Sequence, residues 1–571
     1  MRSYFKFALF AFAMTLVACS TDDGITDGMS GNNGNETLPV KNAQTFTASL
    51  EKNSTRTSST LSGDTWSTIW TPKDAIKVSG SSVTKSFQIA NESDIVDGTT
   101  ATFTNTSDEK LESTEGFYAV YPDVDGLTLS GNTVTGIIPS MQPLETATGI
   151  NPNYQIMTGY ASENAFAFKN LVSFFKVTIS NNEIFKTVKI VSNNNVKIAG
   201  DFTATIASTG VPAVSVTENA NARTFVELRS TKALNGTYYL AVLPTAGSVD
   251  VTLMLEGDYD ATNGQQIYQR VKAGMAFARN NVYDFGTYDC SNSTLKAKTL
   301  SNVVDLGFPS GTLWATRNIS EGSREGTNTT TSFVSNPTDV GGYFAWGEIA
   351  TKSGQYIWGS ASQNYKYGRG ASVAVDVTSI GNVFSTVAQG YLSRYNSYAG
   401  YESRWFSSGN TPSDYVRELA AEDDVAYLTD NRFCIPLYKQ ADELLKNTSR
   451  TKGNNNPYTL TSTVSGYTDR KIVLPAGGYK QENHPISLTN WTPLYNNGSS
   501  ACYWTKQRSD DDDKSYMANR FDITSTSNYT VDGVARAEGR LIRPVVLNSN
   551  IGAVKSYETL KSEASASAAS K

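Results

Sequence analysis

Short runs of alternating apolar and polar residues recur through residues 44–289, and Gly, Asn, Asp and Ser separate them. A period of two places apolar side chains on one face of a strand, and the Thr, Val, Phe and Tyr that fill these runs are typical of half-buried strands. Many short strands at this spacing indicate β-sandwiches, and we place two lobes at residues 44–170 and 171–289. The predicted strands cover residues 45–50, 75–78, 86–90, 100–104, 116–121, 134–138, 166–179, 187–191, 197–206, 224–228, 237–243, 249–255 and 281–285.

The pattern changes at residues 290–300, which we predict to be a junction, and residues 301–547 mix helical and strand signals. Ser413 and Asp414 are N-cap residue types ahead of a predicted helix over residues 415–421, with an extension to residue 428 left open. A second predicted helix covers residues 438–448, with Ala441, Leu444 and Leu445 on one side. Strands are expected at residues 472–475, 501–505, 517–523 and 540–547. This mixture predicts an α+β domain.

The two ends of the chain have biased compositions. Arg2 and Lys6 precede an apolar run over residues 7–17, which is too short for a permanent membrane span. It ends at LVAC, residues 16–19, which resembles the lipoprotein signal of Gram-negative bacteria, so residues 1–18 are predicted to be a signal peptide and Cys19 the lipid attachment site. An ordinary cleaved signal with a chance cysteine is the alternative. Residues 19–43 are predicted to be a flexible leash, and the Ser/Ala/Lys-rich residues 548–571 a disordered tail.

An acidic stretch follows the lipidated cysteine directly, with sequence STDD at residues 20–23. It resembles the surface-export signal of Bacteroidetes lipoproteins, which implies the outer face of the cell outer membrane rather than the periplasm. The acyl chains would then provide the anchoring.

Charge and histidine content exclude several classes of function. The 571 residues carry a formal net charge of −6 with both signs interspersed, so no basic patch of the kind that nucleic acid requires is present. The chain has one histidine, His484, in a turn-like setting (ENHP). Catalytic triads and multi-histidine zinc sites need histidine placed with partners, so neither is expected.

The cysteines give an open question. Apart from Cys19, the chain has Cys290, Cys434 and Cys502, and none of them has a CxxC spacing. Export permits disulfides, so a Cys434–Cys502 bond is possible, with buried free thiols as the alternative.

Residues 44–289 resemble the fimbrillin family of Bacteroidetes pilins, of the FimA and Mfa type. The resemblance rests on TFTASL at 45–50, TRT at 55–57 with the Trp66 and Trp70 stretch and KDAI at 73–76, NLVSFFKV at 170–177, YYLAVLP at 238–244, VDVTL at 249–253, and VKAG at 271–274 with NVYDF at 281–285. It implies two fimbrillin-type β-sandwich lobes. An unrelated β-sandwich is the alternative.

Residues 304–545 resemble a domain common in Bacteroidetes surface proteins. The motifs are VDLGFPSGTLWA at 304–315 with Asn318 and Ile319, GYFAWGE at 342–348, RFCIP at 432–436, LPAGGY at 474–479, YWT at 503–505 and RLIRPV at 540–545. The resemblance implies the fold of the C-type-lectin-like and sulfatase-modifying-factor superfamily. The expected fold class is therefore mainly β: two sandwich lobes followed by an α+β C-type-lectin-like domain.

The second resemblance raises two kinds of metal chemistry, and neither has its motif. The sulfatase-modifying branch uses a cysteine pair to bind copper, but Cys434 and Cys502 lie in no paired-cysteine motif. Lectins of this fold hold calcium with Glu-Pro-Asn or Gln-Pro-Asp loops, which are absent. Hard oxygen ligands exist at 510–513 (DDDD), where a solvated loop is the simpler interpretation. We therefore expect no enzyme activity, no cofactor and no metal site.

Tryptophans supply the candidate ligand-binding residues. Trp314, Trp346 and Trp504 lie inside the family motifs among apolar neighbours and are predicted to be core residues. An indole face also stacks on sugars or fills a partner's pocket. Trp358, Trp405 and Trp491 lie in polar segments, so they are the candidates for a recognition surface.

Together the two resemblances imply a pilus tip subunit, or adhesin, of a Bacteroidetes cell surface. Fimbrillins assemble when a protease removes the first strand and a neighbour's C-terminal strand fills the groove. Arg56, just past the first strand, is the candidate processing site, and an uncut exposed arginine is the alternative. The head after residue 300 occupies the end that would donate a strand, which favours a tip.

The expected partners are fimbrial stalk subunits through donor-strand insertion, a host or bacterial surface glycan or protein, and the outer membrane through acyl chains before processing. The expected location is the cell outer membrane, surface exposed, or the fimbrium. The alternative is a lipid-anchored surface lipoprotein that does not polymerise, or a pilus anchor.

Overall fold

The structure is a computed structural model, in which residues 43–571 form one compact unit. It describes residues 44–51, 69–81, 83–105, 107, 109–144, 151–193, 195–209, 211–320, 324–325, 328–329, 331–344, 346–347, 364–367, 371–374, 418–453, 457–480, 494–509, 517–535, 538–547, 554–556, 559–560, 562–563 and 566. Among these residues, no helix has the length and apolar character needed to cross a membrane.

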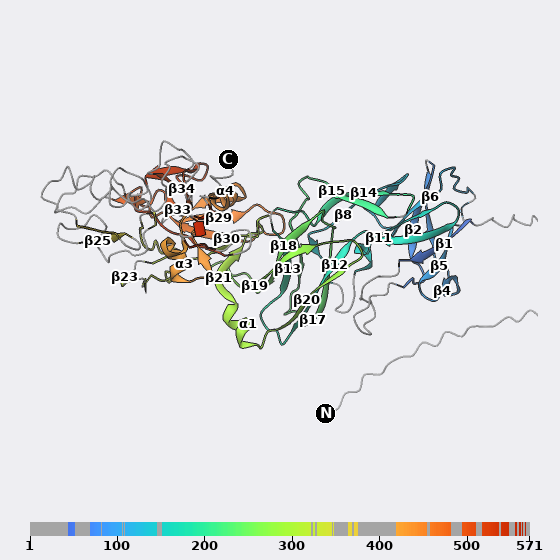
Figure 1. Ribbon diagram of the computed structural model, residues 1–571, viewed down its shortest axis with the longest axis horizontal. Helices are drawn as coiled ribbons and strands as arrows, with labels where there is room; N and C mark the ends of the chain where they lie inside the picture. The colour runs from blue at the N-terminus through green and yellow to red at the C-terminus, as the bar shows by residue number, and fades with distance from the viewer. Residues whose placement is uncertain are drawn as a thin grey trace, which may run out of the picture. The chain divides into compact units, whose positions relative to one another are not determined.

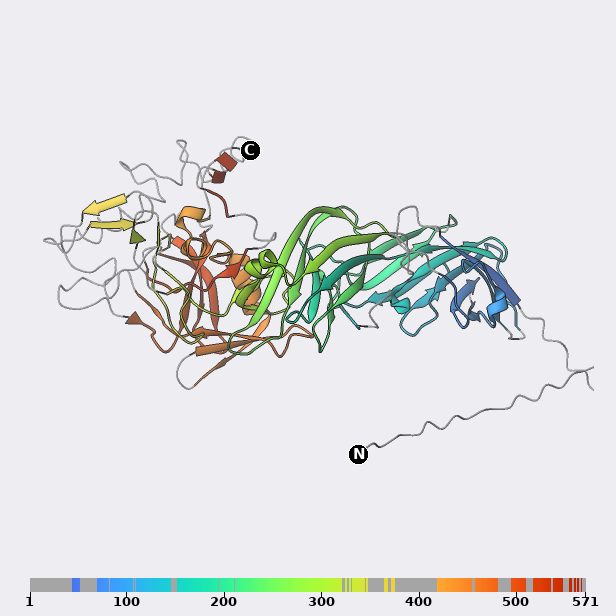
Figure 2. The ribbon, with the colours of Figure 1, turned by 90° about the horizontal axis from the view of Figure 1, so that it is seen from below.

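The first sheet has eight strands in the order β1-β11-β10-β6-β2-β3-β5-β4, and a further pairing joins β1 to β5. The strands enclose a core rich in aromatic side chains, in which Trp70 makes edge contacts with Phe103, Tyr121 and Phe168. In Figure 2 the dark-blue strand β1 lies against the rest of this sheet. The strands are β1 Gln44–Leu50, β2 Ala75–Gly80, β3 Val83–Gln88, β4 Ile95–Val96, β5 Thr100–Asn105, β6 Phe117–Tyr121, β10 Met157–Ala161 and β11 Ala165–Asn170, with a 3₁₀ turn, η1, at Glu92–Asp94.

A second, larger core lies between the sheets β17-β12-β20 and β15-β14-β8-β7 and one end of a nine-stranded sheet. Alternation is clear in β12, where Phe175, Val177 and Ile179 are buried and Lys176 and Thr178 are less so. Its elements are β7 Thr128–Ser130, β8 Thr133–Ile138, β9 Met141–Gln142, η2 Pro152–Tyr154, β12 Ser173–Ser180, β13 Thr187–Ser192, β14 Gly200–Ile206, β15 Pro212–Val216, β16 Phe225–Arg229, β17 Gly236–Val242, β18 Ser248–Glu256, β19 Gln265–Ala276 and β20 Val282–Asp289.

One segment of the first predicted lobe belongs to the second sandwich in the structure. Strands β7 to β9 belong to residues that the sequence assigns to the first lobe, yet β8 pairs with β14 and β9 pairs with β16 of the second. The reason is burial: Leu129, Val134 and Ile138 pack in the core of the second sandwich.

The nine-stranded sheet has the order β27-β36-β22-β21-β19-β18-β13-β16-β9, so it contains strands from both sides of the predicted junction. The junction itself carries helix α1, Ser293–Lys298, whose N-cap Asn292 accepts hydrogen bonds from the backbone of Thr294 and Leu295. Directly after it, β21 pairs with β19. Strands β21, β19, β18 and β13 are successive neighbours in the sheet, and Figure 1 shows them in the same region. The C-terminal members are β21 Leu300–Asp305, β22 Leu313–Ala315, β27 Phe433–Cys434 and β36 Val545–Val546.

The remaining C-terminal elements are short sheets and helices. The predicted second helix is confirmed as α4, Tyr438–Lys446, and the strands expected at residues 472–475, 501–505 and 517–523 are present. They accompany β23 Arg324–Glu325, β24 Asn328–Thr329, β25 Asn364–Tyr367, β26 Ala371–Ala374, η4 Ala421–Asp423, α3 Val425–Thr429, β28 Thr448–Lys452, β29 Pro457–Ser462, β30 Lys471–Pro475, β31 Tyr479–Lys480, β32 Leu494–Tyr495, β33 Ala501–Arg508, β34 Met517–Ile523 and β35 Tyr529–Ala535.

The first predicted helix differs from the structure. Residues 413–417 lie outside the described residues, and Glu418 forms a β-bridge with Gln507 instead of a helical turn. The helical residues come later, in η4 and α3, because the Asp424 side chain caps α3 by accepting from the backbone of Ala426 and Tyr427.

The C-terminal segment also differs from its predicted disorder at the residues that the structure describes. The backbone N–H of Ala421 donates to the carbonyl of Lys555 at 2.9 Å, and Leu560 is buried in a cluster with Phe344 and Leu419. Leu560, together with Val554 against a second cluster, places the described part of the tail on the head.

Candidate functional site

Strand β1 of the first sheet is paired along both of its edges, with β11 on one edge and β5 on the other. It pairs parallel with β11, from Thr47 opposite Ala165 to Leu50 opposite Phe168, and antiparallel with β5, from Gln44 opposite Asn105 to Ser49 opposite Thr100. Without β1, the backbone groups of β5 and β11 would lack these partners, and two sheet edges would be open.

The inward side chains of β1 fill a defined groove. Phe46 is 1% exposed, and its ring centroid lies 5.0 Å from those of Phe87 and Phe117 and 5.1 Å from that of Phe166. Two residues further on, Ala48 is 0% exposed. Burying one such phenylalanine is worth about 1.5–3 kcal/mol, so Phe46 is the main apolar anchor of the strand.

A carboxylate follows the strand directly. Glu51 forms a two-pronged ion pair with Arg279, at 2.7 Å from Nη1 and 3.1 Å from Nη2, and Lys169 Nζ lies 3.7 Å from the same carboxylate. The backbone N–H of Asn170 also donates to Glu51 at 3.3 Å. Arg279 lies between β19 and β20 of the second sandwich, so the end of β1 is tied to that sandwich as well.

Most of the site residues that the sequence predicts lie outside the described residues. They are the lipid attachment residue Cys19, the processing candidate Arg56, and the ligand-binding candidates Trp358, Trp405 and Trp491. Residues 510–513 and His484 also lie outside them. These assignments stay predictions.

The three predicted core tryptophans are buried. Trp314, Trp346 and Trp504 have at most 1% of their surface exposed. The indole N–H of Trp346 donates to the carbonyl of Thr505 at 2.9 Å, and that of Trp504 donates to the carbonyl of Phe344 at 2.7 Å. Both indoles therefore hold the core together and are not available to a ligand.

Cys434 and Cys502 are buried free thiols in the structure, as is Cys290. Burial raises the pKa of the Cys434 thiol far above its ordinary value and that of Cys502 to about 12. Both are protonated at neutral pH, whereas a metal ligand needs the thiolate. In the described part of the chain, no group of three or more His, Cys, Asp or Glu side chains is arranged to hold a metal ion.

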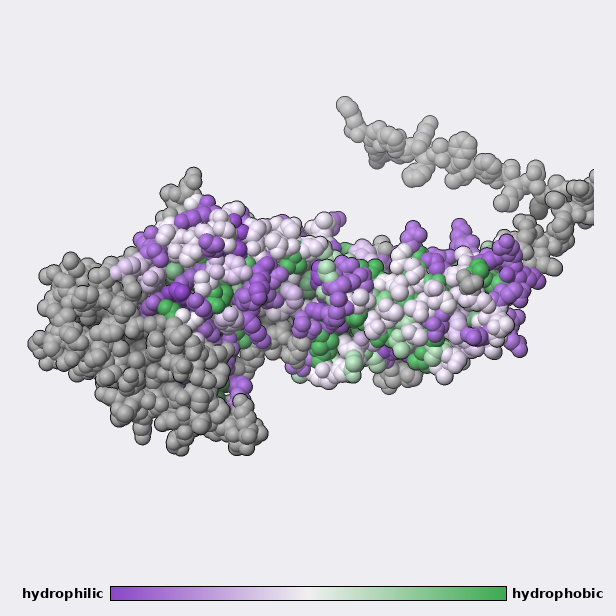
Figure 3. Space-filling view, turned by 90° about the horizontal axis from the view of Figure 1, so that it is seen from above, coloured by the Kyte–Doolittle hydropathy of each residue, from purple (hydrophilic) through white to green (hydrophobic). Residues whose placement is uncertain are grey.

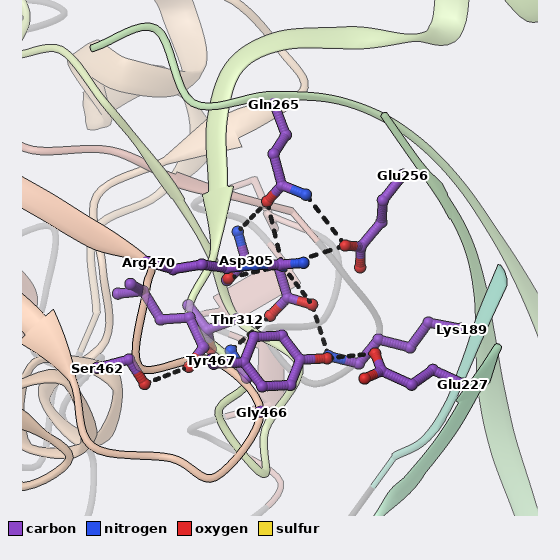
Figure 4. A network of polar contacts seen from close by, with 12 residues as sticks. Lys189, Glu227, Glu256, Gln265, Asp305, Thr312, Ser462, Gly466, Tyr467 and Arg470 are labelled. Carbon is purple, nitrogen blue, oxygen red and sulfur yellow. Dashed lines mark hydrogen bonds and ion pairs between the residues drawn. The ribbon is translucent and has the colours of Figure 1, made fainter. Parts of the chain in front are cut away.

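A buried ionic cluster, which the sequence did not predict, lies between the second sandwich and the C-terminal part (Figure 4). Lys189 of β13 pairs with Asp305 of β21 at 2.5 Å, and neither side chain is exposed. Arg470, just before β30, donates to the Asp305 carbonyl at 3.0 Å and to Glu256 of β18 at 3.2 Å.

The Tyr467 ring forms the centre of this ionic cluster. Its hydroxyl donates to Glu227 at 2.5 Å, while Lys189 Nζ and the Arg229 and Arg470 guanidinium groups lie 4.7, 4.5 and 4.6 Å from the ring centroid. The ring and the neighbouring carboxylates compensate these three cationic groups for the water that they lose on burial.

The pKa values of two carboxyl groups in the ionic cluster are shifted in opposite directions. Burial, together with the neighbouring Asp305 charge, raises the pKa of Glu256 to about 7. Burial would also raise the pKa of Asp305, but Lys189 and Arg470 outweigh that effect and hold it well below its usual range. Glu256 is thus the group that accepts a proton near neutral pH, and Asp305 stays ionised.

On the face that Figure 3 shows, apolar side chains form small patches interrupted by hydrophilic ones. The larger exposed apolar residues belong to all three parts of the chain, from Ile69, Val83 and Val96 through Val271 to Tyr438. Scattered apolar residues of this kind are ordinary for a protein surface.

Comparison with known proteins gives structural similarity and no sequence match. No family model matches the chain, and no curated protein matches it. The chain is similar to a solved structure of a "putative cell adhesion protein" from Bacteroides uniformis, at 15% identity over 45% of this chain and 96% of that one, with a TM-score of 0.29.

Two further solved structures are similar to the chain. A fimbrial protein from Bacteroides ovatus aligns at 9% identity over 88% of this chain and 98% of that one, with a TM-score of 0.20. The major pilin of Streptococcus pyogenes aligns at 11% identity over 43% and 98%, with a TM-score of 0.13. All three scores lie below 0.5, so the function of this chain has to be argued from its own residues.

Proposed function

We propose that this chain is a subunit of a cell-surface filament whose first strand, β1, is removed and replaced by a strand of a neighbouring subunit. The observation that carries the proposal is the position of β1. It supplies backbone pairs to two strands and an aromatic anchor to the core, yet only residues 52–68 connect it to the rest of the described sandwich. A single cut there would leave an edge-lined groove shaped for one extended peptide.

We further assign the chain to the tip of the filament, with residues 301–547 as the end that binds a surface glycan or protein. The support is β36, in which Val545 is opposite both Trp314 of β22 and Cys434 of β27. The last strand of the head is thus an interior strand of its own sheet. Donating it to a neighbour would cost the head two backbone ladders and a buried core, so this chain accepts a strand far more readily than it gives one.

A second candidate function is a lipid-anchored surface protein that does not polymerise. The specific observation in its favour is that β1 is fully bonded on both edges in the intact chain. A protein that keeps this strand has no open groove and needs no partner. In this case Cys19 and its acyl chains would stay on the mature protein.

N-terminal sequencing of the protein from isolated surface filaments separates the two functions. The filament proposal expects a mature N-terminus at residue 57, directly after Arg56, and a protein that begins at Cys19 would contradict it. Arg56→Gln should abolish processing, while Lys52→Gln, a charge removed four residues earlier in the same segment, is the matched control and should be processed normally. Regular spacing of the protein along filaments, seen by immunogold labelling, would contradict the tip assignment.

A glycan array and a panel of surface proteins, probed with the full processed chain, test the binding role of residues 301–547. Replacing Trp358, Trp405 and Trp491 singly by Ala should identify any residue that contacts a ligand. A chain that binds nothing on either panel would remove the adhesin part of the proposal.

A further inference from the structure

We propose that the groove occupied by β1 selects its incoming strand by a three-part pattern: a large aromatic residue, then a small residue two positions later, then a carboxylate three positions after that. This inference rests on the proposed function and specifies the partner of the same site. The partner is an extended segment of another polypeptide that repeats the pattern Phe46, Ala48 and Glu51 and lies parallel to β11 and antiparallel to β5.

The first part of the pattern is the aromatic subsite. Phe46 lies opposite Phe103 of β5, which is 0% exposed, and its ring is surrounded by Phe87, Phe117 and Phe166 at centroid separations of 5.0–5.1 Å. Two of these contacts are edge-to-face, a geometry that an aliphatic side chain cannot reproduce. A strand with alanine here would leave a cavity the size of a phenyl ring.

The second part is the small subsite. Ala48 lies opposite Ala101 on β5 and opposite Phe166 on β11, and both alanines are buried. The Phe166 ring already fills the core beside Ala48, so this position has room for a methyl group and a larger side chain would overpack the core. The groove therefore alternates large and small along its length, which fixes the register of the strand.

The third part is the charge subsite. Arg279 and Lys169 both face the Glu51 carboxylate, and their side chains are 24% and 27% exposed. The removal of β1 together with Glu51 would leave two half-buried cations side by side. An incoming carboxylate at this position relieves that repulsion and restores the two-pronged pair with Arg279.

The charge subsite also connects the incoming strand to the second sandwich. Arg279 belongs to the second sandwich, while Phe46 and Ala48 contact only the first sheet. A strand with the right apolar pattern but no carboxylate would fill the first sheet and leave only the contacts of Asn170 with Arg279 and Asn280 at this place. The carboxylate therefore adds a direct contact between the incoming strand and the second sandwich.

Peptide binding to the full chain tests this pattern. A recognition site for a sequence-specific protease is placed within residues 52–68, the chain is cut, and a fluorescein-labelled peptide of residues 43–51 competes with the native strand. Anisotropy gives its affinity. We expect the Phe46→Ala and Ala48→Phe peptides to bind at least about tenfold more weakly, and the Glu51→Gln peptide about fivefold more weakly. The Thr47→Lys peptide, changed on the exposed face, is the matched control and should bind within about twofold of the native sequence.

Reversing the charge of Arg279 is the decisive part of this experiment. Arg279→Glu in the chain should weaken binding of the native peptide and strengthen binding of the Glu51→Lys peptide. Arg279→Gln is the milder variant, and it should remove the difference between native and Glu51→Gln peptides. Equal affinity of native, Phe46→Ala and Glu51→Lys peptides would overturn the pattern, as would failure of excess native peptide to displace the cut strand. Filaments that start at residue 57 would still support the proposed function in that case.

Discussion

At the scale of single residues, the pair of Lys189 and Asp305 joins two parts of the chain that the sequence treats as separate. The two side chains are 2.5 Å apart and fully buried, and they come from positions 116 residues apart. A buried ion pair is poor evidence for net stability, because desolvation opposes the attraction. Its removal one partner at a time is nevertheless costly, since the remaining charge loses its compensation.

A double-mutant cycle on this pair is the first prediction. Lys189→Met and Asp305→Leu should each lower the free energy of unfolding by about 3–5 kcal/mol, because each leaves one buried charge with weaker compensation. The double variant should lose less than the sum of the two single losses. Urea denaturation followed by fluorescence measures all four chains.

The matched control for this cycle is Lys186 and Asp258, a pair 2.6 Å apart whose side chains are 28% and 72% exposed. The same substitutions there should cost less than about 1 kcal/mol each. If the buried and exposed pairs behave alike, the ionic cluster does not join the second sandwich to the head.

The pH dependence of stability is the second prediction, and it concerns Glu256. Its pKa is about 7 in the folded chain and near its ordinary value of 4.5 in the unfolded chain. Between these values the folded chain binds the extra proton, so stability falls as pH rises from 4.5 to 7. Asp305 adds the opposite trend only at acidic pH, because its pKa is lowered and its contribution is lost as pH falls through that value.

Glu256→Gln, a neutral residue of the same shape, should therefore flatten the stability profile between pH 5 and 8. The free energy of unfolding of the variant should exceed that of the native chain at pH 8 by up to about 3 kcal/mol and match it at pH 5. Chemical denaturation at four pH values provides the comparison. Parallel profiles for the two chains would mean that Glu256 does not titrate in this range.

At the scale of elements, the turn between β18 and β19 fits against the neighbouring strand β21. Gly264 has φ of +75°, and a Cβ atom there would lie 2.3 Å from the carbonyl oxygen of Val303. The position needs glycine for both its backbone conformation and the close approach of β21.

Gly264→Ala is the third prediction, with an expected loss of about 2–4 kcal/mol because the left-handed conformation and the clash add up. Gly247→Ala, at a glycine whose Cβ would meet nothing within 4 Å, is the control and should change stability little. Thermal unfolding of the two variants measures the difference. Equal melting temperatures would show that β21 moves away from the turn easily.

Elements also show how far the sequence predicts this structure. Alternation predicted a strand over residues 166–179, which the structure divides into β11 and β12, and the apolar side of α4 predicted that helix. Strand β13 was predicted as well, although all of its residues are buried. The place of β7 to β9 in the second sandwich was not predictable, because the pattern of a strand shows which face is buried but not which sheet covers that face. Glu51, Lys169 and Arg279 were also missed, because charged residues near strand ends are usually solvated.

At the scale of the whole molecule, the second sandwich and the head share one sheet and one ionic cluster. Strands β19 and β21 pair across the predicted junction, and Tyr467 and Arg470 of the head contact charges of β16 and β18. The first sheet shares no strand with this assembly, and its contacts with the second sandwich are made by side chains, which include Glu51 on Arg279 and Val120 of β6 in the second core. We therefore expect two cooperative units in which the boundary lies between the sandwiches.

Calorimetry of the full chain gives the fourth prediction. Val251→Ala in the second sandwich and Leu444→Ala in the head, both at fully buried positions, should lower the same transition because the two cores unfold together. Phe103→Ala in the first sheet should lower a different transition. Independent shifts for Val251→Ala and Leu444→Ala would show that the head is a separate unit.

The shared sheet has a mechanical consequence for a protein held at one part and pulled at another. Tension applied to the head would pass into the second sandwich through adjoining backbone ladders and a dry ion pair, with no slack tether between them. Force on a ligand bound by the head would therefore reach the second sandwich without passing through a flexible linker. The first contact to break would be the one between head and ligand or the one between the groove and its strand.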